Sequence, residues 1–205
     1  MEKKQIIFIR GGEAFDTEEQ FWNYIENRKY NPFETNKSWR DWIGWALSEE
    51  FEVMEPNMPN KQKAQYSAWK IWFEKLFPFL NSQELIIIGH SLGSIFLAKY
   101  LSENKFPKQI SQLHLVSPIF DSEGLVGETA GDFVFDSRNL KNLEEQADEI
   151  YLYHSEDDPL VPIEHTKKYV DELPSASVQI FKDRGHFAQP SFPELLENIN
   201  RNENS

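Results

Sequence analysis

The sequence of 205 residues contains no cysteine. This absence excludes a disulfide framework and any zinc site with cysteine ligands, and it is compatible with a reducing compartment. A long hydrophobic run is also missing near the N-terminus, where four apolar residues stand together at positions 6–9. Such a run is too short for a signal peptide or a membrane span. We therefore expect a cytoplasmic protein that does not span a membrane.

Basic residues are scarce: 21 Lys and Arg stand against 34 Asp and Glu, which gives a formal net charge of −13. Nucleic acids and anionic membranes are bound through a basic face, so we expect neither as a partner. The sequence has no histidine–carboxylate spacing typical of a metal site and no glycine pattern typical of a phosphate loop. We therefore expect a small-molecule substrate, no metal and no cofactor, and the sequence identifies no protein partner.

The chain is long enough to bury one hydrophobic core, and we assign residues 1–205 to a single domain. Short apolar runs typical of strands lie at residues 6–9, 51–54, 85–88, 113–116, 150–153 and 178–181. Most of these runs are continuous, as in strands that are covered on both faces, and apolar residues at helical spacing lie between them. Strands that alternate with helices predict a mostly parallel sheet of about six strands, with helices on both faces.

Two pairs of residues have the spacing of a capping box, in which two side chains bond each other's backbone N–H groups at a helix start. They are Thr17 with Gln20, and Ser191 with Glu194. Because apolar residues at helical spacing follow each pair, we expect a helix to begin at both.

Two connecting segments are longer than a simple connection requires. Residues 13–50 separate the first two expected strands, and residues 118–142 separate the fourth from the fifth. Segments of this length often form lids or binding loops, although ordinary surface decoration would explain them equally well.

The motif Gly-His-Ser-Leu-Gly at residues 89–93 carries the strongest functional signal. It follows an expected strand and precedes an expected helix, which is the context of a nucleophile elbow. Glycines stand two positions on either side of the serine because a Cβ there would clash with the neighbouring strand and helix. We therefore predict that Ser91 is a nucleophile, with the helix N-terminus behind it donating N–H groups to an oxyanion.

A serine hydroxyl needs a base, and the sequence offers five histidines. His186 follows the last expected strand and precedes the last helix, where the base stands in this chain order, and Gly185 beside it leaves the loop free to turn. His114 lies within a buried strand and is expected in the core, and His90 is expected to point away from the nucleophile. The other two histidines, His154 at a strand end and His165 at a helix start, offer no such position.

The acid that orients the histidine is expected at the end of the preceding strand. Asp158 is our first choice, because the proline after it restricts the turn. Asp157 is the alternative, and Glu156 and Asp121 are weaker candidates. Either member of the aspartate pair could instead cap the helix that begins near residue 162.

Residues 89–93, the Asp-Asp-Pro-Leu-Val-Pro segment at 157–162 and Gly-His-Phe at 185–187 together resemble the α/β-hydrolase superfamily. Within this superfamily, the chain is similar to the small serine hydrolases typified by retinoblastoma-binding protein 9. Residues 55–60, after the second expected strand, also resemble the corresponding segment of these proteins. The resemblance implies a three-layer α/β-hydrolase fold and a Ser91–Asp158–His186 triad.

One position departs from the pattern of this superfamily, whose members often carry His-Gly after the first core strand. Here the sequence reads Arg10-Gly11-Gly12. By position, the N–H of Gly12 would be the second oxyanion donor beside that of Leu92, with Glu13 as an alternative. We expect Arg10 to form a structural ion pair, although contact with an anionic substrate group is the other possibility.

These assignments predict hydrolysis of a carboxylic ester, or less readily an amide, through an acyl-enzyme. Phe133 and Phe135 in the 118–142 segment, and Trp42 with Trp45 in the 13–50 segment, are candidates for an acyl pocket. Two alternatives remain open: an interaction protein with a vestigial triad, and an acyltransferase or peptidase that uses the same triad.

Overall fold

A computed structural model describes residues 3–29, 31–33, 38–81 and 84–201 of the protein. Its centre is a six-stranded parallel sheet in the order β2-β1-β3-β4-β5-β6. The strands are β1 (Lys4–Ile9), β2 (Phe51–Met54), β3 (Leu85–His90), β4 (Ile110–Val116), β5 (Ala147–Ser155) and β6 (Ser177–Phe181). Each of them contains one of the six apolar runs, so the predicted sheet is confirmed.

The inner strands are buried because successive side chains enter two different hydrophobic cores. Ile7 and Ile9 of β1 lie in one core, and Ile6 and Phe8 lie in the other. This accounts for continuous rather than alternating apolar runs. The edge strand β6 differs, since its Ile180 side chain is exposed.

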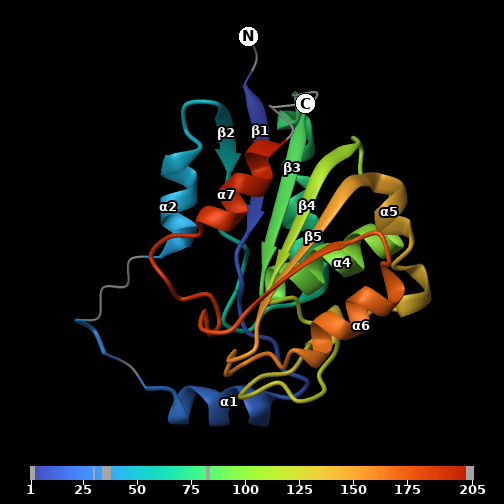
Figure 1. The fold of residues 1–205 in the computed structure, drawn as a ribbon. Helices are drawn as coiled ribbons and strands as arrows, with labels where there is room; N and C mark the ends of the chain where they lie inside the picture. The colour runs from blue at the N-terminus through green and yellow to red at the C-terminus, as the bar shows by residue number, and fades with distance from the viewer. Residues whose placement is uncertain (1–2, 30, 34–37, 82–83, 202–205) are drawn as a thin grey trace.

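Helices form a layer on each face of the sheet (Figure 1). One face is covered by α2 (Trp39–Ala46) and α7 (Pro193–Ile199), whose apolar side chains share a core with Ile6 and Phe8. The other face is covered by α3 (Tyr66–Glu74), α4 (Leu92–Glu103), α5 (Asn142–Gln146) and α6 (Glu164–Glu172). The protein therefore has the three-layer α/β-hydrolase architecture that the sequence predicts.

Helix α1 (Glu18–Asn27) lies apart from both layers, across the carboxyl-terminal edge of the sheet (Figure 1). The two long segments meet near this edge, where Ala14 and Thr129 form an isolated antiparallel bridge. They therefore stand over the edge at which ligands bind in open α/β sheets. In the described part of the chain, no helix has the length and apolar character needed to cross a membrane.

The two expected capping boxes have different outcomes. Thr17 and Gln20 form the predicted reciprocal cap at the start of α1. At α7 the N-cap is Phe192 without a side-chain cap, so the prediction of a second box is wrong. The Glu194 carboxylate instead accepts a hydrogen bond from Arg184 at 2.6 Å, because an ion pair with the preceding loop replaces the local cap.

Candidate active site

Ser91 lies between the end of β3 and the start of α4 with φ 56° and ψ −122°. This left-handed backbone is strained for a residue with a Cβ, and such strain costs about 1–3 kcal/mol. The turn is held by hydrogen bonds from the Ser91 N–H to Val116 O at 2.9 Å and from Ser94 N–H to Ser91 O at 2.8 Å. These bonds keep the serine at the carboxyl edge of the sheet.

The flanking glycines are needed for close packing. A Cβ at Gly93 would lie 2.2 Å from Ile9 O, and one at Gly89 would lie 2.8 Å from Gly93 O. Neither contact is possible without a shift of the backbone, so the clash that the motif predicts is present. The tight β1–β3–α4 packing is therefore what permits the sharp turn at Ser91.

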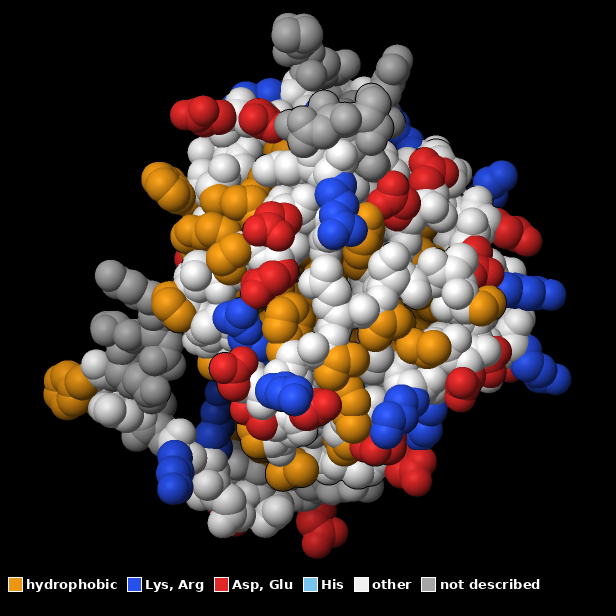
Figure 2. Space-filling view, viewed as in Figure 1, with side chains coloured by type: hydrophobic (Ala, Val, Ile, Leu, Met, Phe, Trp, Pro, Cys, Tyr) orange, Lys and Arg blue, Asp and Glu red, His pale blue; other side chains and the backbone are white. Residues whose placement is uncertain are grey.

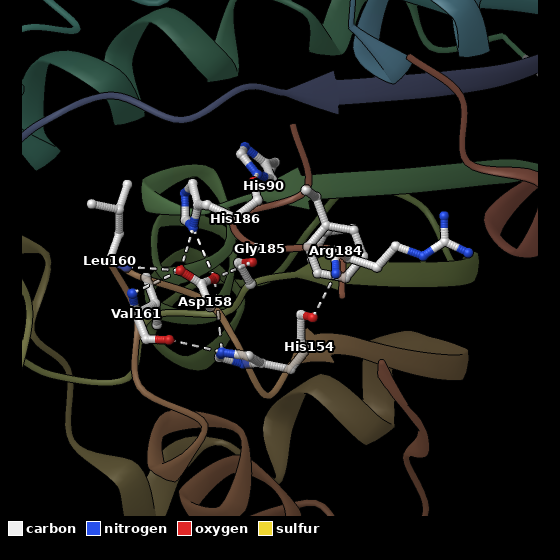
Figure 3. Close-up of polar contacts among 12 residues, drawn as sticks. His90, His154, Asp158, Leu160, Val161, Arg184, Gly185 and His186 are labelled. Carbon is white, nitrogen blue, oxygen red and sulfur yellow. Dashed lines mark hydrogen bonds and ion pairs between the residues drawn. The ribbon is translucent and has the colours of Figure 1, made fainter. Parts of the chain in front are cut away.

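Asp158 and His186 are brought together from two different loops. The Nδ1 atom of His186 lies 2.9 Å from Asp158 Oδ2 and 3.1 Å from Oδ1. Figure 3 shows the carboxylate between the His186 ring and the backbone of Leu160 and Val161. The Asp158 side chain is 1% exposed, whereas that of His186 is 17% exposed. A buried carboxylate thus faces an imidazole whose other side opens toward solvent.

The remaining Asp158 contacts satisfy the buried carboxylate. Its Oδ1 accepts hydrogen bonds from the N–H groups of Leu160 at 2.9 Å and Val161 at 3.0 Å, and its Oδ2 accepts one from Ser117 Oγ at 2.8 Å. Burial alone would raise the pKa of Asp158, but the His186 hydrogen bond and these N–H donors lower it overall. Asp158 therefore remains ionised. It caps the turn that follows it rather than the helix that we considered as the alternative, since α6 begins after Ile163 without a side-chain cap.

Asp157, the alternative acid, has a different position. Its Oδ1 accepts hydrogen bonds from the Gly185 N–H at 2.8 Å and from Ser155 Oγ at 2.5 Å. The Ser155 Oγ in turn accepts one from the Arg184 N–H at 2.9 Å. Asp157 therefore holds the backbone of the loop that carries His186. In the part of the chain that the structure describes, its carboxylate makes no hydrogen bond to the His186 ring.

Two neighbours of this pair were not predicted. Ser117 follows β4 in a left-handed conformation with φ 44°, and its place at a strand end was the available signal. His90, which we expected to point away, lies in the site: its ring centroid is 4.9 Å from that of His186 and its Nε2 is 3.3 Å from His186 O. Burial and the charges of His186 and Arg40 lower the pKa of His90, so it remains neutral.

The three other histidines have structural roles. His114 is buried in the core as predicted, and its burial lowers its pKa to about 3. His154 donates to Val161 O at 2.9 Å, and His165 donates to Glu123 O at 2.8 Å. His154 and His165 each fix a loop at the carboxyl edge, and burial lowers the pKa of both rings.

Ser91 and His186 line one cavity of about 600 Å³. Gly11 passes beside the serine, since a Cβ there would lie 3.0 Å from Ser91 Cβ. The Glu13 N–H donates to Lys61 O at 2.7 Å, so this N–H is not free to bond an oxyanion. This favours Gly12 over Glu13 as the second oxyanion donor. Leu92 is the first residue of α4, where an N–H has no partner within the helix.

Both long segments contribute to the cavity wall, Tyr24 and Arg28 from one and Val126 and Glu128 from the other. The Glu13 carboxylate accepts hydrogen bonds from Tyr24 OH at 2.6 Å and from Arg28 at 2.8 Å. Burial, together with the charge of Glu13, raises the pKa of Glu128 to about 8. The two segments were predicted to border the site, but these polar residues in them were not.

Arg10 forms the structural ion pairs that we expected. Its guanidinium lies 2.7 Å from Asp41 Oδ1 and also pairs with Glu55. These bonds tie the end of β1 to α2 and to the segment after β2.

The acyl-pocket candidates are corrected by the structure. Phe133 is fully buried in the core against Tyr66 and Trp69, and Phe135 packs on Phe120 and Tyr169. Trp42 packs against the core beneath α2, and Trp45 is 76% exposed. None of the four lines the cavity around Ser91. Composition and position were a poor guide here, because apolar side chains of a long loop fill the core beneath it.

Phe133→Ala is therefore expected to destabilise the fold rather than to change acyl-chain selectivity. Loss of a fully buried phenylalanine costs about 3–5 kcal/mol, which urea unfolding would measure. Phe79→Ala, at a position 67% exposed, is the matched control and should have little effect. A selective loss of activity on long acyl esters at unchanged stability would show that Phe133 does contact substrate.

Residues 33–199 match the serine hydrolase family. No curated protein sequence matches the chain. Among solved structures, the ydeN gene product of B. subtilis is similar with a TM-score of 0.76 at 19% identity, covering 99% of this chain and 100% of that one.

Two further structures are similar over most of their length. The meta-cleavage product hydrolase from Pseudomonas fluorescens IP01 has a TM-score of 0.64 at 12% identity and covers 98% of this chain and 89% of its own. The thioesterase domain from the curacin biosynthetic pathway has a TM-score of 0.59 at 13% identity, and the match covers 97% of this chain and 90% of that domain. At such low identity these likenesses establish the α/β-hydrolase fold.

The family match extends to the end of α7 and includes Ser91, Asp158 and His186. Fold, chain order and family thus agree. The chain belongs to the serine hydrolase family.

Proposed function

We propose that the protein hydrolyses a carboxylic ester of a small molecule through an acyl-enzyme formed on Ser91. The observation that carries this proposal is the pairing of His186 Nδ1 with the buried Asp158 carboxylate at 2.9 Å, at the cavity that Ser91 lines. A histidine oriented in this way keeps its Nε2 free to act as a base.

In the first half of the reaction, His186 Nε2 accepts the Ser91 hydroxyl proton as Oγ attacks the ester carbonyl carbon. Asp158 holds the imidazole in the tautomer with hydrogen on Nδ1 and stabilises the cation that forms. The imidazolium then gives its proton to the leaving alcohol, and the C–O bond of the ester breaks. Ser91 is left as an acyl ester.

The negative charge that develops on the carbonyl oxygen needs preorganised donors. We assign these to the N–H groups of Leu92 and Gly12, from the first turn of α4 and from the loop after β1. The packing of Gly11 against Ser91 supports this assignment, because it brings the β1 loop beside the nucleophile.

In the second half, His186 removes a proton from water, which attacks the acyl carbon and releases the acid. The cycle requires no cofactor. An amide could enter the same sequence, but its poorer leaving group makes an ester the favoured substrate.

A fluorophosphonate probe tests this function, because such probes phosphonylate a serine only when its base activates it. We expect a single adduct, which peptide mass spectrometry should place on Ser91, and turnover of simple acyl esters. A protein that forms no adduct and turns over no ester would be an interaction protein with a vestigial triad.

The choice between hydrolase, acyltransferase and peptidase is made by product analysis. With an acyl ester in the presence of competing alcohols and amines, the free acid should be the main product. Accumulation of a new ester or amide would assign the protein as an acyltransferase, and faster cleavage of peptides would assign it as a peptidase.

A further inference from the structure

The charge of the cavity around Ser91 is opposite to that of the whole chain. The chain carries a net charge of −13. On the face in Figure 2, acidic and basic side chains are interspersed rather than gathered into one patch. The cavity is lined by four cationic side chains and two acidic ones, namely Arg10, Arg28, Arg40, Lys61, Glu13 and Glu128. A cationic cavity in an acidic protein favours an anionic ligand.

Most of these charges have a partner or are solvated. Arg10 pairs with Asp41 and Glu55, Arg28 pairs with Glu13, and Lys61 is exposed. The Glu128 carboxyl adds little negative charge at pH 7, because burial and Glu13 raise its pKa to about 8. The excess positive charge is therefore carried by the exposed Lys61 and by Arg40, which is the partly buried one of the two.

Arg40 makes no ion pair with any residue that the structure describes. Within the described part of the chain, its guanidinium has one polar contact, in which Nη1 donates to Phe187 O at 3.4 Å. Burial and the charge of Arg10 lower the pKa of Arg40 more than the charges of Asp41 and Glu55 raise it, although a guanidinium stays charged in proteins. The carboxylates of Asp41 and Glu55 act on Arg40 but are paired with Arg10. A partly buried cation that pairs with no described carboxylate is unfavourable, and a bound carboxylate would offset that cost.

The position of Arg40 connects it to the catalytic loop. Trp39 Nε1 donates to Phe187 O at 2.9 Å, which fixes the start of α2 against the loop that carries His186. Arg40 follows directly and approaches the same carbonyl oxygen. The guanidinium is thereby held on the side of the cavity where the base lies, and it contributes to the low pKa of His90.

We propose that Arg40 binds a free carboxylate of the substrate, so that the ester cleaved at Ser91 belongs to a molecule with a second, anionic end. The planar guanidinium presents paired N–H donors that match the two oxygens of a carboxylate. This inference rests on the proposed esterase function. It makes Arg40 a determinant of substrate specificity.

Matched esters test this inference. The monoethyl esters of succinic, glutaric and adipic acid place a carboxylate at increasing distance from the ester, and the corresponding monoamide ethyl esters are neutral and nearly isosteric. A second pair, O-acetyl-4-hydroxybutyrate and its amide, places the carboxylate in the leaving alcohol. Release of ethanol or acetate gives kcat/KM for each, and we expect at least one acid to exceed its amide.

In Arg40→Gln, kcat/KM for the preferred acid should fall by about 10- to 100-fold, as expected for a lost hydrogen bond between charged groups. The neutral amide should change little, and Arg40→Lys should restore part of the preference. Arg138→Gln is the control, because that guanidinium is exposed and pairs with Asp136 away from the cavity. It should leave both substrates unaffected.

Preference for the amide in every pair, or an equal loss on acid and amide in Arg40→Gln, would overturn the inference while leaving the esterase function intact. If no ester is hydrolysed, the proposed function fails, and calorimetry with glutarate then decides the binding site. Binding by the wild-type protein that is lost in Arg40→Gln supports the site. Equal binding, or no binding by either protein, overturns it.

Discussion

Ser91→Ala should lower kcat for ester hydrolysis by about 10⁴- to 10⁶-fold, as is typical when the nucleophile of a catalytic triad is removed. The reason is that the reaction then loses both the acyl-enzyme and the proton transfer that forms it. Stability should be nearly unchanged, because alanine and serine both place a Cβ on the strained backbone at φ 56°. Initial rates and urea unfolding of the two proteins measure these effects.

Ser102→Ala is a suitable control, since Ser102 lies on the same helix and its Oγ bonds Lys99 O at 2.9 Å away from the cavity. It should retain kcat. Ser91→Gly should be as inactive as Ser91→Ala but more stable, because glycine relieves the left-handed strain. Turnover in purified Ser91→Ala at more than a hundredth of the wild-type rate would assign the nucleophile elsewhere.

The same experiment extends to His186, the base in the proposed reaction. His186→Ala should lose nearly as much activity as Ser91→Ala, and the double variant should lose no more than either, because the two residues act as one unit. Losses that multiply in the double variant would mean that they act independently.

The sheet could be predicted because its signal is local. A run such as residues 85–88 is apolar at every position, since alternate side chains enter separate cores. Gly89 ends the run after four residues, and so short an apolar run is typical of a buried strand rather than of a helix. That Ser91, Asp158 and His186 lie at one edge of the sheet could be predicted for a related reason. Each follows a recognisable strand, and the carboxyl ends of parallel strands converge on one edge.

Features that depend on contacts between distant segments could not be predicted. The Glu194 side chain bonds Arg184 rather than capping α7, and Arg40 reaches the cavity because Trp39 is fixed to the loop after β6. Phe133 is a further example, since it was expected in an acyl pocket and lies in the core. The sequence pattern of an apolar residue in a long loop does not distinguish a side chain that contacts substrate from one that packs in the core.

Asp158→Asn should reduce kcat by about 10⁴-fold, which is the scale expected when the acid of such a triad becomes an amide. Asp158 Oδ1 accepts from the N–H groups of Leu160 and Val161, so the amide oxygen will take that place. The NH₂ group then occupies the position of Oδ2 and donates toward His186 Nδ1. The proton of the imidazole moves to Nε2, where it blocks the removal of the Ser91 proton.

Asp157→Asn is the matched control. The donors around the Asp157 side chain explain why this change should have a small effect. Both of its hydrogen bonds, from the Gly185 N–H and from Ser155 Oγ, reach the single oxygen Oδ1, which an asparagine retains. We therefore expect a loss in kcat of less than about tenfold, in line with the small effect of replacing an exposed group that only positions a loop. The kcat values of the two variants, measured with one ester, decide between the aspartates. A larger loss in Asp157→Asn than in Asp158→Asn would move the role of the acid to Asp157, and the 2.9 Å contact between Asp158 and His186 would then serve only to hold the loop.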